Sequence, residues 1–199
     1  MKYLGFQLNP SAYSISDWSW IINKFYKKIS RWEYKCLSLV GRMILSQSVL
    51  AQLSVYWAHL YYIPSAIIKK LNSLMASFIW GGSKEKRKYH LTKLKNISLP
   101  KKMGGWGIMH IRSFGMALLC KSLWRVVFGD NIWSIAMKIK YLGNKYISFW
   151  YRNSLLGPRQ GSTIWRSFKK VSQFFLKRLI WKLQSGNNIL IGMDSILGV

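Results

Sequence analysis

The stretch SAIIKKLNSLMASFIWGG, residues 65–82, carries the clearest folding signal in this chain of 199 residues. Its apolar residues recur every three or four positions, which is the spacing of one face of an α-helix. They are Ile67, Ile68, Leu71, Leu74, Met75, Phe78 and Ile79. Pro64 suits a helix start because it lacks the N–H that the first turn leaves unpaired, and Gly81-Gly82 suits a helix end. We therefore predict an amphipathic helix between Pro64 and Gly81.

Two further helices are predicted before this one. Ser16 or Asp17 can cap the first, which has one apolar face and one basic face. The apolar face comprises Trp18, Ile21, Ile22, Phe25, Ile29 and Trp32, and the basic face comprises Lys24, Lys27, Lys28 and Arg31. A second helix, nearly free of charge, is expected from Ser38 to about Ile63. Three amphipathic helices with short connections predict a bundle.

Residues 43–63 allow a second interpretation, because they contain no Asp, Glu, Lys or Arg. A helix of this length would measure about 30 Å, which is enough to cross a bilayer, and flanking cations could bind anionic lipid. The alternative function is therefore a small basic membrane-associated protein. Polar residues interrupt the segment, however, and each is unfavourable in hydrocarbon. They are Ser46, Gln47, Ser48, Gln52, Ser54 and His59. The buried helix is the favoured interpretation.

The charge of the chain favours a polyanionic partner. Lys and Arg number 31 against 5 acidic residues, which gives a formal charge of +26. Self-repulsion at this charge is costly unless a polyanion neutralises it, and the interspersed aromatic residues suit base stacking as well as core packing. Half of the residues are hydrophobic, with 11 Trp, so a disordered basic tail is excluded. We expect RNA, DNA or an RNA–DNA duplex as the partner, and no small-molecule substrate.

The same composition argues against catalysis and metal binding. Two-metal phosphoryl transfer needs clustered carboxylates, but the acidic residues are scattered along the sequence: Asp17, Glu33, Glu85, Asp130 and Asp194. Cys36 and Cys120 lack zinc-site spacing and are interpreted as reduced core thiols. We predict no catalytic residue, metal or other cofactor. No secretory leader is recognised at the start, so a nuclear or cytoplasmic location is expected.

Basic residues crowd residues 83–102, a segment with little periodicity. Four of them, Lys84, Lys86, Arg87 and Lys88, are predicted to form a phosphate-contacting cluster, and Lys101 and Lys102 a second one. A solvated loop is the alternative for such a charge run. Arg42, near the start of the uncharged helix, is predicted either to contact a phosphate or to anchor its helix through a hydrogen bond.

The remaining segments complete the expected fold. Residues 3–8 suggest a strand that ends at Asn9-Pro10, and glycines at 104–107 indicate a tight turn rather than a phosphate cradle. Helices are expected at about 114–127, 132–141 and 163–179, followed by a hairpin around Gly186-Asn187. The predicted class is mainly α: a helical bundle with a short N-terminal strand and a small C-terminal helix plus β-hairpin. The predicted divisions are residues 1–15, 16–143 and 144–199.

Several short motifs occur in an order and spacing that resemble a known family. They are Lys2-Tyr3-Leu4-Gly5; Trp32 with Lys35, Leu37-Ser38 and Gly41-Arg42; Phe78-Ile79-Trp80-Gly81; Pro100-Lys101 before Gly104-Gly105-Trp106-Gly107-Ile108; Ala117-Leu118-Leu119 with Lys121 and Trp124-Arg125; Ser148-Phe149-Trp150; Ile164-Trp165-Arg166-Ser167; and Trp181 with Gly186-Asn187 and Asp194. From residue 2 to about residue 198 the chain resembles the region downstream of the catalytic core in the reverse transcriptases of plant LINE-type (non-LTR) retrotransposons.

This resemblance implies a role for each part of the chain. Residues 1–15 would be a remnant of the polymerase palm, in which Tyr3, Leu4 and Gly5 match the strand that helps to hold the primer end. Residues 16–143 would be the thumb, which clamps the template-primer duplex, and residues 144–199 a linker before a zinc-binding segment. The chain would then lie between the catalytic aspartates and the zinc ligands.

The function expected on this basis is limited to binding. A fragment of an RNA-directed DNA polymerase that lacks the catalytic aspartates is not expected to be an enzyme on its own, and Mg²⁺ is expected only for the complete polymerase. At most it would bind a nucleic-acid duplex non-specifically through its basic thumb. A third possibility is a reading frame that yields no stable product, because its helices lose their contacts with the palm. The sequence gives no prediction of the oligomeric state.

Overall fold

The computed structural model describes residues 2–3, 6–7, 13–33, 37–81, 89–143 and 161–180. These residues are mainly helical, which confirms the main part of the predicted fold class. The chain divides into two compact units, Met1–Ala117 and Leu118–Val199. The division falls within helix α6 (Ile111–Phe128), so this helix contributes residues to both units. The sequence-based divisions after residues 15 and 143 stay predictions.

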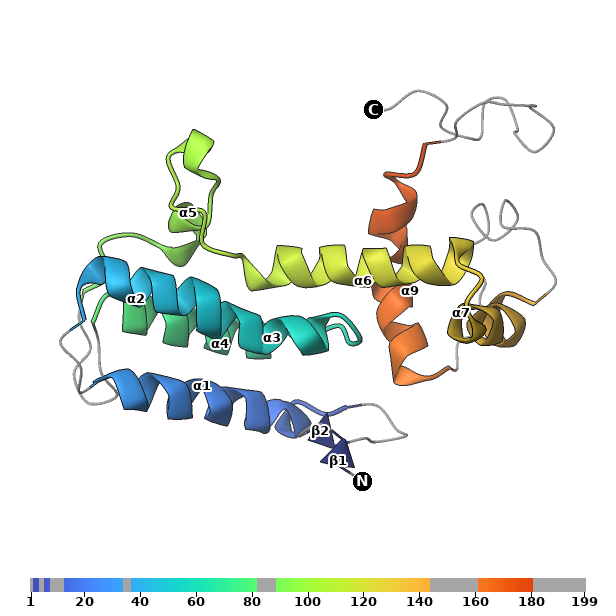
Figure 1. The fold of residues 1–199 in the computed structure, drawn as a ribbon, viewed down its shortest axis with the longest axis horizontal. Helices are drawn as coiled ribbons and strands as arrows, with labels where there is room; N and C mark the ends of the chain where they lie inside the picture. The colour runs from blue at the N-terminus through green and yellow to red at the C-terminus, as the bar shows by residue number, and fades with distance from the viewer. Residues whose placement is uncertain are drawn as a thin grey trace. The chain divides into compact units, whose positions relative to one another are not determined.

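Three helical segments lie side by side in the first unit (Figure 1). The first is the 3-10 turn η1 (Ser16–Trp18) with helix α1 (Ser19–Glu33). The second runs through α2 (Leu39–Leu45), the π-helical turn η2 (Ser46–Leu50) and α3 (Ala51–Ala58), and the third is α4 (Ser65–Ile79). Trp20 contacts Trp57 with ring centroids 5.2 Å apart. Trp32 contacts Phe78 at 5.4 Å. The start of α1 therefore lies beside the end of α3, and the ends of α1 and α4 lie together.

The core of the first unit is formed by the apolar stripes that the sequence predicts. Trp18, Ile21, Phe25 and Ile29 of the first segment are buried, as are most residues of the α4 stripe. Each such aliphatic or aromatic side chain contributes roughly 1.5–3 kcal/mol when it leaves water. The predicted cap at Ser16 or Asp17 takes a different form, because the Asp17 carboxylate accepts the Ser14 N–H at 2.7 Å.

The uncharged segment is a helix packed against α1 and α4, and it ends at Ala58 rather than near Ile63. The chain forms a turn after Ala58, and the following Tyr61 and Ile63 are buried. Its polar residues are accommodated locally: the Ser48 hydroxyl donates to Ile44 O at 2.7 Å, and the Ser54 hydroxyl donates to Ala51 O at 2.7 Å. Among the helices that the structure describes, none combines the length and the apolar character needed to cross a bilayer.

The second unit contains the C-terminal part of α6, then α7 (Ile132–Met137), the π-helical turn η4 (Lys138–Leu142) and α9 (Thr163–Leu176). Tyr141 stacks on Trp165 with ring centroids 4.4 Å apart, and the Tyr141 hydroxyl accepts the Ser162 N–H at 3.0 Å. The side chain of Ser162 caps α9 by accepting the Trp165 N–H. These contacts join the end of η4 to the start of α9. The predicted helices at 132–141 and 163–179 correspond to these elements.

The predicted strand at residues 3–8 is not found. Two strands of two residues each, β1 (Lys2–Tyr3) and β2 (Phe6–Gln7), pair antiparallel instead, with Lys2 opposite Gln7. A single extended strand would leave its backbone N–H and C=O groups unpaired, and the fold-back satisfies some of them. The predicted hairpin around Gly186-Asn187 lies outside the described residues.

Candidate nucleic-acid interface

Residues 97–108 form a loop that projects from the helices of the first unit (Figure 1). Helix α5 (Leu94–Ile97) leads into it, and the 3-10 turn η3 (Lys101–Met103) forms its tip. The two sides of the loop are joined by backbone hydrogen bonds, from Trp106 N–H to Ile97 O at 2.9 Å and from Gly107 N–H to Leu99 O at 3.0 Å. Gly104 has a φ of 79° and closes the tip, so the predicted tight turn is confirmed.

The base of this 97–108 loop is fixed to the helices. Ile97 and Ile108 are buried, and the ring of Trp106 lies 5.7 Å from that of Trp80 at the end of α4. The side-chain amide of Gln47, in η2, donates to Gly107 O at 3.3 Å. Ring packing against the end of α4 and a hydrogen bond from η2 therefore hold the base of the loop in a defined position.

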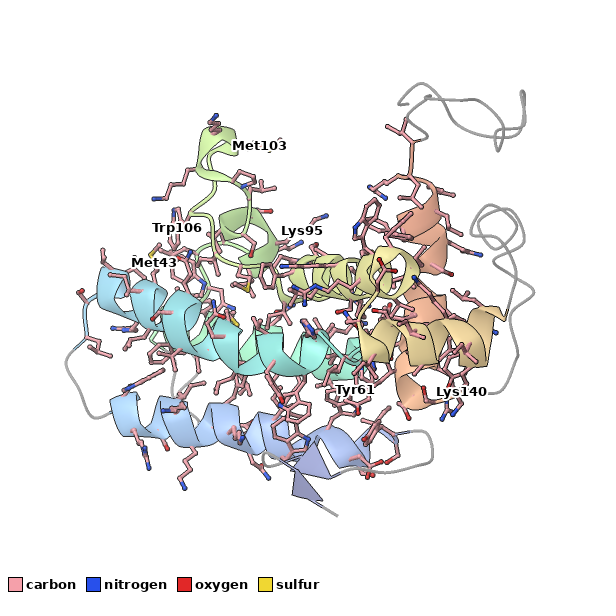
Figure 2. All side chains as sticks on the ribbon, turned by 45° about the vertical axis from the view of Figure 1, so that its right-hand side comes forward. Met43, Tyr61, Lys95, Met103, Trp106 and Lys140 are labelled. Carbon is pink, nitrogen blue, oxygen red and sulfur yellow. The ribbon has the colours of Figure 1, made fainter. Side chains whose placement is uncertain are left out.

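Cations and one apolar side chain occupy the tip. Lys101 and Lys102 are exposed, and Met103 beside them is 69% exposed. Figure 2 shows Met103 at the far end of the loop, with Lys95 nearer to the helices. No Asp or Glu occurs between residues 86 and 129 of the sequence. A rigid projection that carries adjacent lysines and no local acid can contact phosphates, and such contacts would position a nucleic acid without reading its sequence.

Substitution of Gly105 by Ala is expected to disrupt this loop. A Cβ at Gly105 would lie 2.0 Å from Leu99 O, which is a backbone atom and cannot move aside without opening the loop. Gly104→Ala is the matched control, because a Cβ there meets nothing within 4 Å and costs only the left-handed backbone, roughly 1–2 kcal/mol. Hydrogen exchange of the Trp106 and Gly107 amides should become fast in Gly105→Ala. Equal protection in the two variants would contradict this account.

A second basic face lies on α1. Lys24, Lys27 and Arg31 are exposed and recur at helical spacing, and the ammonium group of Lys24 lies 5.0 Å from the ring centre of Trp20. In both figures α1 and the 97–108 loop lie on opposite sides of the α2–α3 segment. One straight duplex could not readily touch both faces. The sequence predicts that this face meets either solvent or phosphate, and its contact with phosphate stays a prediction.

The predicted contact residues fall into three groups. Lys101 and Lys102 are described and lie together at the loop tip. Six of the predicted residues lie outside the described residues: Lys84, Lys86, Arg87, Lys88, Leu4 and Gly5. Tyr3 belongs to strand β1. The proposed contacts of all these residues stay predictions.

Arg42 has the geometry of the helix-anchoring alternative. Its Nε and Nη2 donate to Leu37 O at 3.1 and 2.9 Å, just before the start of α2. A Cβ at Gly81 would lie 2.0 Å from Arg42 Nη1, so the glycine makes room for the guanidinium. Arg42 thus hydrogen-bonds the backbone just before α2, and its guanidinium lies beside Gly81 after the end of α4. A contact of Arg42 with phosphate stays a prediction.

The described residues hold no cluster of three or more His, Cys, Asp or Glu side chains that could bind a metal ion. Burial raises the pKa of the Cys120 thiol, and the positive charge of Arg178 opposes this shift. The thiol is therefore protonated at neutral pH and a poor nucleophile. Cys36 lies outside the described residues.

The chain is similar to a plant protein. It is 33% identical over 149 residues to the "Putative ribonuclease H protein" of Arabidopsis thaliana. The match covers 74% of this chain but only 23% of the Arabidopsis protein. No family model matches the chain. No solved structure matches it either.

Proposed function

We propose that this chain is a segment of a retroelement-encoded plant polymerase, the thumb-like region downstream of the catalytic core of a LINE-type reverse transcriptase. In this role it binds a nucleic-acid duplex through the phosphate backbone and performs no chemistry of its own. The Lys101 and Lys102 tip of the 97–108 loop makes the contact, together with the basic residues predicted at 84–88. The observation that carries the proposal is the rigid, cationic loop in a chain of formal charge +26.

The similarity to the Arabidopsis protein supports the same origin. A ribonuclease H cleaves the RNA strand of an RNA–DNA hybrid, and such hybrids are the product of reverse transcription. A chain with the motif order of a reverse transcriptase and 33% identity to a ribonuclease H protein is consistent with a retroelement that encodes both activities. The expected partner is therefore an RNA–DNA, DNA or RNA duplex, and the expected location is the nucleus or the cytoplasm.

Neutralising the loop tip tests the proposed contact. Each phosphate contact contributes about 0.9 to the slope of log affinity against log salt, so Lys101→Gln with Lys102→Gln should lower the slope by roughly 1.8. Lys27→Gln with Arg31→Gln is the matched control, because it removes the same charge from the far face of the first unit. Fluorescence anisotropy with a labelled RNA–DNA duplex measures both slopes.

The two double variants separate a defined contact from a general effect of charge. If the slope of log affinity against log salt is the same in both double variants, binding depends only on the net charge of the chain. That result would contradict the assignment of the contact to the loop tip. Duplexes of unrelated sequence should bind with similar affinity, because backbone contacts carry no sequence information.

A further inference from the structure

The second unit exposes aromatic side chains on α6 and α9. Trp124 is 48% exposed, Phe128 is 44% exposed and Phe174 is 37% exposed. The rings of Trp124 and Phe128 form a pair with centroids 4.2 Å apart. Side chains of this size are normally covered, so a group of them at the surface indicates a binding function.

Cations accompany these rings. Lys121 and Arg125 are exposed, and each lies three positions before one of the rings, Lys121 before Trp124 and Arg125 before Phe128. Residues three and four apart are neighbours on a helix, so all four residues share one face of α6. On α9 the guanidinium of Arg178 lies 3.6 Å from the ring centre of Phe174. The only acidic residues between 118 and 199 in the sequence are Asp130 and Asp194. The aromatic surface is therefore strongly positive.

Contacts between the two helices place these groups near one another. Trp124 of α6 meets Phe175 of α9 edge to face, with ring centroids 6.3 Å apart. Arg178, one turn further along the chain, is close enough to Cys120 for its charge to act on the thiol. The end of α9 thus lies beside residues 120–124 of α6, and the pair formed by Phe174 and Arg178 lies at this end of α9.

We propose that this surface, comprising Lys121, Trp124, Arg125, Phe128, Phe174 and Arg178, is a binding site for single-stranded nucleic acid. Unpaired bases stack on the exposed rings, and Lys121 and Arg125 contact the phosphates between them. Sites for single strands combine a positive surface with aromatic platforms in this way, and stacking on each ring contributes roughly 1–3 kcal/mol per base. A duplex cannot use the rings, because its bases are already stacked inside.

A protein partner is the competing occupant of an apolar surface, but the composition disfavours it. The central part of a protein–protein interface is enriched in aromatic residues and arginine, but lysine is depleted there. Here Lys121 lies beside Trp124, and the surface contains three cations and no acidic residue. A polyanion with flat apolar faces matches both features of the surface.

Two probes of equal charge test the proposal on the full chain. One is a fluorescein-labelled oligo(dT) of about 20 nucleotides, and the other has the same backbone but no bases. The wild-type chain should bind oligo(dT) at least roughly tenfold more tightly than the abasic strand, because only oligo(dT) can stack. Equal affinity for the two strands would overturn the proposal without the need for any variant.

Variants then assign the effect to the surface. Trp124→Leu with Phe174→Leu removes two rings without a change in charge and should weaken oligo(dT) binding roughly tenfold, while binding of the abasic strand stays the same. Trp133→Leu is the control, because Trp133 is 41% exposed on α7 of the same unit. An equal loss in the control, or an equal loss for both strands, would refute the assignment. Circular dichroism verifies that the variants fold. The double variant Lys101→Gln with Lys102→Gln should leave the preference for oligo(dT) over the abasic strand unchanged. This result would separate the single-strand site from the duplex contact.

Discussion

Affinity for an RNA–DNA duplex is expected to fall roughly a thousandfold when the salt concentration rises from 50 to 200 mM, if six cations contact phosphates. Six is the number of lysines and arginines predicted at the 84–88 cluster and the loop tip together. Each contact releases condensed counterions, and the entropy of their release decreases as the bulk salt becomes more concentrated. Anisotropy of a labelled duplex over a series of salt concentrations measures the slope.

The origin of the slope can be checked by changing the duplex. Because the contacts are to phosphates, RNA–DNA and DNA duplexes of several sequences should give steep slopes of similar size. A flat salt dependence would contradict the proposed mode of binding, since hydrogen bonds and apolar contacts with bases respond little to salt. A steep slope for one sequence only would point to base readout instead.

The helices of the first unit could be predicted from the sequence because their periodicity is local. On α4 the predicted stripe is buried except for Leu74, which is half-buried. On α1 the cations Lys24, Lys27 and Arg31 are exposed as expected, and Lys28 is half-buried. A stripe of this kind depends only on residues three and four positions apart, so a short window contains all of the required information.

The projecting loop could not be predicted in the same way. It is defined by hydrogen bonds from Trp106 and Gly107 back to the carbonyls of Ile97 and Leu99, and these partners share no periodic pattern. The glycines indicated a turn but not the projection that it closes. Sequence alone also left two alternatives open for Arg42. Its hydrogen-bond partner is the backbone oxygen of Leu37, and because every residue has such an oxygen, no sequence pattern identifies it.

The aromatic site on the second unit shows a further limit of pattern reading. Helix α6 carries apolar residues on nearly every side, so its sequence pattern does not show which side is exposed. Only the packing of α9 determines which rings are covered: Phe175 is buried against Trp124, while the adjacent Phe174 remains partly exposed. Neighbouring residues of the same type thus have different roles, which tertiary contacts alone decide.

Phe25→Ala is expected to destabilise the first unit by about 3–5 kcal/mol, because it removes a fully buried ring from the middle of α1. Such a loss approaches the whole stability of many domains of this size. Lys27→Ala, two positions further along the same helix, is the control and should change the stability by less than about 0.5 kcal/mol, since Lys27 is exposed. Urea unfolding followed by circular dichroism measures both changes.

The same experiment decides whether the chain folds without the rest of a polymerase. If the helices need contacts with an absent palm, the wild-type chain will show no cooperative transition and Phe25→Ala will change nothing. If the core formed by α1, α3 and α4 is sufficient, the wild type will unfold cooperatively and the variant will unfold at lower urea. We expect the second outcome, because the buried faces of these three segments meet one another through Trp20 with Trp57 and Trp32 with Phe78. A missing transition would remove the rigid support of the 97–108 loop, and with it the structural basis for duplex binding.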